Sequence, residues 1–262
     1  MILILSTGGA SGIGRFLAER LVSKGMKVVV SDRNFKGAEE VAQDLNKNGQ
    51  VAWAAQVDVA DWDSQRKAFE TAVEKLGRVH YVFPVAGITE RLWIPNEPSG
   101  DGFVKPDLSV FDINGTGALY TSALATQHFR AQQPNKYGFR GKSNSAVVGF
   151  VRSYGKFLPE EKITLNAICP CIVRTGISSN EFYNKIEAKG LLTPVETLLG
   201  AFEELLGDCT TSGEAIEILP GSGGSKIKER PEYTSKECKT SVELAHARSY
   251  KAFFGASRAT QS

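Results

Sequence analysis

A glycine-rich turn near the start of the chain constrains the fold more than any other feature. Residues 2–5 are an apolar run typical of a short buried strand, and the turn 7–14 follows it directly and leads into a helical pattern. In such a turn, Gly8 permits the tight bend, Gly12 lets the backbone approach a pyrophosphate, and Gly14 lets the helix pack closely on the sheet. The start of the helix then offers free N–H groups to phosphates. The turn therefore predicts a dinucleotide site.

An acidic residue at the end of the next strand bears on the choice of dinucleotide. Residues 27–31 read as a second buried strand, and Asp32 follows them. A carboxylate at this place accepts hydrogen bonds from the adenosine ribose and repels a 2′-phosphate, which favours NAD over NADP. Two alternatives stay open: Asp32 is a solvated strand-end carboxylate, or the neighbouring Arg33 accommodates NADP.

The composition excludes several classes of function. A chain of 262 residues with 42% hydrophobic content predicts one α/β domain spanning 1–262, with residues 226–262 as a charged C-terminal extension. The formal charge of +2 favours neither nucleic acid nor membrane as a partner, and a small-molecule substrate fits better. No apolar run approaches the roughly 20 residues that span a bilayer, so we expect a cytoplasmic protein. The four cysteines have no zinc-site spacing, which predicts reduced structural thiols and no metal site.

Strand and helix patterns alternate along the chain, which predicts a Rossmann-type, doubly wound parallel sheet with helices on both faces. The tail has a helical pattern around Val242 and Tyr250 and could cover a substrate pocket or a partner subunit. The predicted strands are 51–55, 79–85, 163–168 and, as the last of the sheet, 214–219. The predicted helices are 36–46, 61–76 and 107–132, with a loop on the active-site side at 89–106.

These motifs together resemble the short-chain dehydrogenase/reductase family over nearly the whole chain, and most closely its fungal, prostaglandin-dehydrogenase-like branch. The resemblance rests on the turn 7–14, on Asp32, Asp58 and Asn114, and on the Cys-Pro…Val-Arg-Thr segment 169–175. It implies that Asn114 anchors a water of the catalytic proton relay. Asp58 could reach the adenine, or could be only a turn residue. The cofactor-binding residues implied are Gly8, Ser11, Gly12, Ile13, Gly14, Asp32, Asp58, Val59, Ala86, Gly87, Asn114, Val173 and Thr175.

The chain departs from the family where the chemistry is expected. Two departures are mild: Val85 stands where the family has an asparagine, and Cys171 stands where it has a glycine. The family moves the hydroxyl proton with a tyrosine whose pKa is lowered by a lysine four residues later, and a serine orients the substrate oxygen. No Tyr-x-x-x-Lys occurs among the seven tyrosines of this chain. Tyr137 and Tyr154 come nearest, and both are interpreted as packing residues.

The missing Tyr-x-x-x-Lys pair can be assigned to one region of the chain. Residues 146–158 follow a helical period like the family's helix after the catalytic lysine, which puts Asn144 at the lysine position and Arg140 at the tyrosine position. Residues 134–143 lack the apolar strand that should carry the serine. The sequence thus predicts that the sheet lacks one central strand, through a deletion or an incorrectly joined coding sequence between Lys142 and Ala146. The alternative is that residues 135–145 fill the gap.

The resemblance implies an NAD-dependent oxidoreductase that acts on a secondary alcohol or ketone and could form a homo-oligomer. Without the Tyr-x-x-x-Lys pair, its catalytic competence is open. The alternative is a catalytically inactive protein that binds a cofactor or ligand as a scaffold or in a non-redox role.

Overall fold

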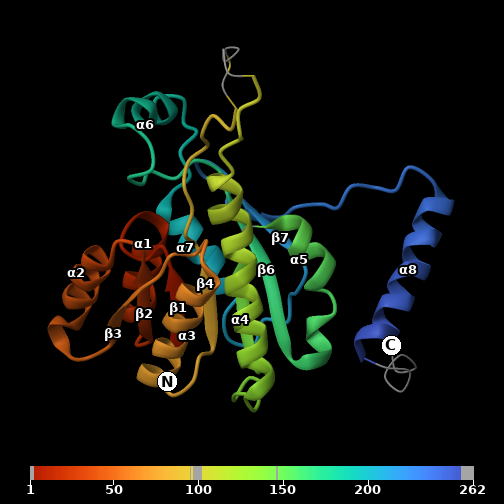
Figure 1. Ribbon diagram of the computed structural model, residues 1–262, viewed down its shortest axis with the longest axis horizontal. Helices are drawn as coiled ribbons and strands as arrows, with labels where there is room; N and C mark the ends of the chain where they lie inside the picture. The colour runs from red at the N-terminus through yellow and green to blue at the C-terminus, as the bar shows by residue number, and fades with distance from the viewer. Residues whose placement is uncertain (1–2, 95, 97–101, 146, 255–262) are drawn as a thin grey trace. The chain divides into compact units, whose positions relative to one another are not determined.

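A single sheet forms the centre of the computed structural model, which describes residues 3–94, 96, 102–145 and 147–254 (Figure 1). Among these residues the strand order is β3-β2-β1-β4-β5-β6-β7-β8. Strands β1 to β7 are parallel and β8 is antiparallel to β7. The Rossmann-type parallel sheet predicted from the sequence is confirmed. The strands are β1 (Leu3–Thr7), β2 (Lys27–Asp32), β3 (Ala52–Gln56), β4 (Tyr81–Pro84), β5 (Gly141–Ser145), β6 (Ile163–Pro170), β7 (Ala215–Ile218) and β8 (Ser225–Ile227).

Helices cover both faces of this sheet. In the described part of the chain, the short helical turns are η1 (Asn46–Asn48), the π-helical η2 (Phe111–Thr116) and η3 (Leu158–Glu161). The α-helices are α1 (Gly12–Ser23), α2 (Phe35–Leu45), α3 (Trp62–Leu76), α4 (Gly117–Ala131), α5 (Val148–Tyr154), α6 (Asn180–Glu187), α7 (Val195–Glu204) and α8 (Lys236–Phe254). Neither α6 nor α7 was predicted from the sequence, and the helix predicted for residues 107–132 is divided into η2 and α4.

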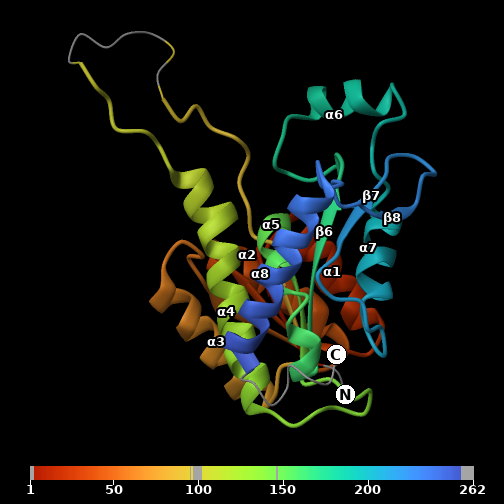
Figure 2. The ribbon, with the colours of Figure 1, turned by 90° about the vertical axis from the view of Figure 1, so that its right-hand side faces the viewer.

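Each face of the sheet has its own hydrophobic core. Helices α1, α2 and α7 pack on one face, where Leu21, Val41 and Phe202 are buried. Helices α3, α4 and α5 pack on the other face, around Phe69 and Phe129. Figure 2 shows α3 and α4 on one side of the strands and α1 and α7 on the other. This arrangement directs the carboxyl ends of the parallel strands toward one common edge.

The sequence prediction was wrong about the end of the sheet. Residues 214–219 were expected to form its last strand, but a glycine turn after β7 leads into β8. Strand β8 pairs with β7 from Ile216↔Ile227 to Ile218↔Ser225. A three-residue strand is too short to show a period of two, which explains why it was missed.

The prediction of a missing central strand was also wrong. Residues Gly141–Ser145 form β5, which lies between β4 and β6 and supplies the ladder partners that both need. It pairs with all of Ile163–Ala167 on β6 but with only Tyr81 and Val82 on β4. The open alternative, in which residues 135–145 fill the gap, is the one that the structure supports.

Strand β5 escaped prediction because none of its side chains is apolar. A Cβ atom on Gly141 would lie 2.1 Å from the ring of Phe129, so the strand passes under this ring only because it begins with glycine. Lys142 is 3% exposed, lies with its ammonium 3.9 Å from the ring centre of Phe139, and donates to the Cys209 carbonyl. Burial lowers the pKa of Lys142 from 10.5 to about 8. The buried Ser143 hydroxyl has no hydrogen-bond partner among the described residues.

The chain divides into two compact units, residues 1–227 and 228–262. In the second unit, α8 carries Leu244 with 69% of its surface exposed. None of the helices in the described part of the chain is long and apolar enough to cross a bilayer.

Candidate cofactor site

A cleft of about 740 Å³ lies at the carboxyl ends of the parallel strands. Segments after β1, β2, β3, β4 and β6 line it, together with residues from η2 and α6. Of the residues implied by the family resemblance, Asn114 alone does not line the cleft. Those that do are Gly8, Ser11, Gly12, Ile13, Gly14, Asp32, Asp58, Val59, Ala86, Gly87, Val173 and Thr175.

The glycine turn forms the cleft wall beside the start of α1, and its geometry requires glycine. Gly8 and Gly12 have φ values of +68° and +51°, which are strained for residues with a side chain. A Cβ atom on Gly14 would lie 2.2 Å from the carbonyl oxygen of Gly8. The exposed Ser11 begins α1 without a side-chain cap, so backbone N–H groups of the first helical turn are left to face the cleft. These features fit a bound pyrophosphate.

The Asp32 carboxylate is held at the end of β2 by two backbone groups. Its Oδ2 accepts from the Ala10 N–H at 3.0 Å, and its Oδ1 accepts from the Asn34 N–H at 2.9 Å. The first bond ties the glycine turn to β2, and both keep the carboxylate at the cleft wall. Asp32 therefore stabilises the turn and presents a fixed negative charge to the cleft.

Asp58 has the features of a turn residue as well as a place in the cleft. Its Oδ1 accepts from the Ala60 N–H at 3.0 Å, as expected of a turn residue, which is one of the two roles that the sequence left open. Its Oδ2 lies 3.8 Å from Nε of Arg33, whose side chain is 80% exposed. An ion pair this exposed contributes little to stability, so Arg33 stays available to a ligand.

The β4 side of the cleft is organised by two polar side chains. The Thr7 hydroxyl accepts from the N–H groups of Val85 and Ala86, at 3.1 and 3.3 Å. Asn114 pairs with both backbone groups of Ile88, accepting at 2.8 Å and donating at 2.9 Å. The side chain of Asn114 thus holds the segment after β4 in place from behind the cleft wall.

The β6 side contains a tyrosine that the sequence analysis missed. Tyr183 on α6 is 1% exposed, and its hydroxyl lies 3.2 Å from the Thr175 hydroxyl and accepts from the Ser178 N–H at 3.2 Å. Helix α6 has only eight residues, and its N-cap Ser179 was the one local signal for it. Tyr183 therefore connects α6 to the segment that the resemblance assigns to the nicotinamide.

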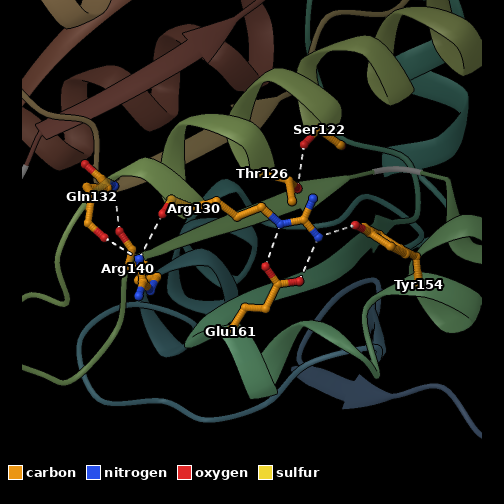
Figure 3. Close-up of polar contacts among 7 residues, drawn as sticks. All are labelled: Ser122, Thr126, Arg130, Gln132, Arg140, Tyr154 and Glu161. Atoms are coloured by element: carbon orange, nitrogen blue, oxygen red, sulfur yellow. Dashed lines mark hydrogen bonds and ion pairs between the residues drawn. The ribbon is translucent and has the colours of Figure 1, made fainter. Parts of the chain in front are cut away.

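The residues at the family's tyrosine and lysine positions lie away from the cleft. Arg140 donates to the carbonyls of Arg130 and Gln132, both at 2.9 Å, and so caps the C-terminus of α4 (Figure 3). Asn144 is 6% exposed within β5. The register pairs it with Asn166 of β6. Neither residue lines the cleft, and neither replaces the chemistry of the family pair.

Tyr154 belongs to the same polar network as Arg140. Its hydroxyl accepts from Arg130 at 3.1 Å, and Arg130 also donates to both carboxylate oxygens of Glu161, at 2.5 and 2.7 Å (Figure 3). Tyr137 lies on the surface, 38% exposed. Among the described residues that line the cleft, Tyr183 is the one tyrosine and no lysine occurs.

Ser145 is the described residue of β5 nearest to the cleft edge of the sheet. It is the last residue of the strand, is 2% exposed, and accepts from the Val147 N–H at 3.3 Å. No group of three or more metal-ligating side chains occurs in the described part of the chain.

Comparison with known proteins identifies the family. The sequence profile of the short chain dehydrogenase family matches residues 2–136. A short-chain dehydrogenase/reductase of Penicillium rubens, prx6, is 32% identical over 241 residues, covering 83% of this chain and 79% of the relative. Versicolorin reductase stcU of Emericella nidulans is 31% identical over 188 residues, covering 66% of this chain and 69% of the relative.

A solved structure with the same fold is the 3-ketoacyl-(acyl-carrier-protein) reductase of Brucella melitensis complexed with NADH. It superimposes with a TM-score of 0.68 at 21% identity, covering 83% of this chain and 96% of that one. The sheet order, the glycine turn and the two sequence matches agree with one another. The chain belongs to the short-chain dehydrogenase/reductase family of oxidoreductases.

Proposed function

We propose that this chain is an NAD(H)-binding oxidoreductase that acts on a secondary alcohol or ketone, with hydride transfer slowed by the loss of the family's proton relay. The observation that carries the proposal is the glycine turn, where the Gly14 Cβ position lies against the Gly8 carbonyl beneath the start of α1. This close approach leaves room for a pyrophosphate at the helix terminus. The NADH-complexed reductase from Brucella melitensis, which has the same fold, supports this assignment.

The preference for NAD over NADP rests on Asp32. Because Ala10 and Asn34 hold the carboxylate through their backbone N–H groups, it cannot turn away from an adenosine ribose without breaking two hydrogen bonds. A 2′-phosphate would meet this charge at close range, and Arg33 offsets only part of the repulsion because its side chain is 80% exposed and solvent screens its charge. We therefore expect the chain to bind NADH more tightly than NADPH.

A fluorescence titration with both reduced cofactors tests this preference. The variant Asp32→Ala should lose it, whereas Asp63→Ala, which removes an exposed carboxylate on α3, should keep it. Because Asp32 also holds the glycine turn, Asp32→Asn serves as a second variant that removes the charge and keeps one of the two acceptor oxygens. Tighter binding of NADPH by the unchanged chain would refute the assignment.

The missing proton relay sets the rate of hydride transfer that we expect from this chain. General acid–base catalysis contributes roughly 10²- to 10⁴-fold to such reactions, and this chain has no Tyr-x-x-x-Lys to supply it. The second candidate function, a protein that binds the cofactor without turning over substrate, is favoured by the same observation. Cofactor binding with no turnover on any ketone would establish the second candidate.

The proposal also includes an origin for the missing catalytic segment. Strand β5 supplies the ladder partners of its neighbours, and no Tyr-x-x-x-Lys occurs in the chain. We propose that a segment with the family's serine, tyrosine and lysine was lost between Lys142 and Ala146, by deletion or by incorrect joining of the coding sequence. Sequencing the native transcript across this junction, together with the intact mass of the native protein, distinguishes the two.

A further inference from the structure

Charge is distributed unevenly along the cleft. Three charged side chains line it among the described residues: Asp32, Arg33 and Asp58. Asp32 is the last residue of β2, and Arg33 and Asp58 come from the segments after β2 and β3, so all of them belong to one end of the strand order. This charged end is where the proposed function places the adenosine.

The opposite end of the cleft has no charged lining residue in the described part of the chain. It is formed by the segments after β4 and β6, by η2 and by α6. Helix α6 lies beyond the carboxyl ends of the strands (Figure 1). Tyr183 lies at this end too, with its hydroxyl hydrogen-bonded to Thr175 and the Ser178 N–H. The other large side chains are apolar, and we call them the apolar end of the cleft. Its members are Ile88, Ile113, Ile172, Ile177 and Phe182.

The strand order sets the distance between the two ends. In the order β2-β1-β4-β5-β6, two strand spacings separate β2 from the β4 part of the apolar end and four separate it from the β6 part, which is roughly 10 and 19 Å at about 4.8 Å per spacing. A group bound at the β6 part of the apolar end, beside Ile177 and Phe182, is therefore too far from Asp32, Arg33 and Asp58 for direct contact. Recognition there depends on apolar contact and on the few neutral polar groups of Thr89, Thr175, Ser178 and Tyr183.

The apolar end also exposes side chains that a ligand would cover. Ile177 is 52% exposed and Phe182 is 39% exposed, although both line the cleft. Burying such surfaces drives the binding of apolar ligands. A carboxylate or phosphate at the same place would lose its hydration without gaining a charged partner, which is unfavourable.

We infer that the substrate site of this chain takes a neutral, largely apolar ketone or alcohol and disfavours anionic carbonyl compounds. The inference deepens the proposed function, on which it rests, by naming the substrate class of the same cleft. It depends on the neutral and apolar side chains at one end and on the distance to the charged end, and it does not depend on whether hydride transfer is fast.

A pair of matched ketones tests the substrate class. Acetophenone and 4-acetylbenzoate share one skeleton and differ by a carboxylate. We expect the protein saturated with NADH to bind acetophenone at least tenfold more tightly, as measured by saturation-transfer NMR titration. Equal or tighter binding of 4-acetylbenzoate would overturn the inference, and so would binding of neither ketone by protein that binds NADH.

A positive charge introduced at the apolar end tests whether the ketones bind there. Phe182→Lys should weaken acetophenone and strengthen 4-acetylbenzoate, each by about tenfold. Phe35→Lys is the matched control, because Phe35 is 38% exposed but lies on α2 outside the cleft lining, and it should change neither affinity. Near-UV circular dichroism checks folding, and Ile177→Lys replaces Phe182→Lys if that variant does not fold.

Failure of the inference and failure of the proposed function give different results. If NADH does not bind, the proposed function fails, while the comparison of the two ketones on the protein alone still decides the substrate class. If NADH binds and Phe182→Lys leaves both ketone affinities unchanged, the ketone site lies elsewhere and the inference is wrong.

Discussion

Replacing Lys142 by methionine should stabilise this protein at neutral pH. Lys142 is 3% exposed on the central strand β5, and its ammonium is met by the Cys209 carbonyl and the Phe139 ring. Among the described residues, no carboxylate forms an ion pair with it within 4 Å. A buried cation without an ion-pair partner costs free energy of folding.

The pKa gives the magnitude of this cost. Burial lowers the pKa of Lys142 from 10.5 to about 8, so at pH 7 the charged form is disfavoured in the folded protein by about 3 kcal/mol. Methionine removes this cost but also loses the hydrogen bond to Cys209, which contributes about 1 kcal/mol. The net gain in the free energy of unfolding should be about 2 kcal/mol at pH 7, or roughly 4–8 °C in Tm.

The pH dependence distinguishes this explanation from simple repacking. The folded protein releases the Lys142 proton near pH 8 and the unfolded chain only near 10.5, so the unfolded state binds more protons between these values. The wild type therefore gains stability relative to Lys142→Met as the pH rises through this window. The advantage of the variant should shrink or reverse by pH 10.

Urea unfolding of both proteins at pH 7, 8.5 and 10 measures this difference. Lys67→Met is the control, because Lys67 is exposed on α3, and it should change stability little at any pH. A variant that is less stable than wild type at pH 7, or an advantage that does not depend on pH, would refute the reasoning.

Two further predictions concern the cleft. Gly14→Val should abolish NADH binding, because even its Cβ would lie 2.2 Å from the Gly8 carbonyl. The control Gly200→Val, where a Cβ meets nothing within 4 Å, should retain NADH binding. Unchanged NADH affinity of folded Gly14→Val by calorimetry would contradict the assignment. Tyr183→Phe should weaken NADH by about three- to tenfold while leaving ADP-ribose unchanged, because the lost hydroxyl holds Thr175 at the proposed nicotinamide end. Equal weakening of both ligands would indicate a general structural role for Tyr183.

The part of the fold that sequence patterns could predict is the part with strong hydrophobic periodicity. The strand around Val29 contains a continuous apolar run, and the strand around Leu165 alternates apolar with polar residues; both were recognised as buried strands of a parallel sheet. The Gly14 position was recognised because the motif has one mechanical purpose, and its close contact with Gly8 agrees with that purpose.

The part that could not be predicted depends on tertiary context. Strand β5 consists of polar residues, and its place is determined by the unpaired edges of β4 and β6 and by the room for Gly141 beneath Phe129. Tyr183 was missed for a related reason. Its hydrogen bonds to Thr175 and Ser178 cross from α6 to the segment after β6, and a local pattern does not reveal such contacts.

The rate of NADH consumption by protein saturated with NADH tests the central claim most directly, which is that this family member keeps the dinucleotide site but lacks the proton relay. The assay uses a panel of prochiral neutral ketones, with Tyr137→Phe and Tyr154→Phe as controls. We predict saturable NADH binding with turnover absent or roughly 10²- to 10⁴-fold below that of an enzyme with the relay. Turnover at ordinary enzymatic rates, of about 1–10³ s⁻¹, would contradict the account, and its loss in either variant would show that the catalytic tyrosine lies outside the cleft described.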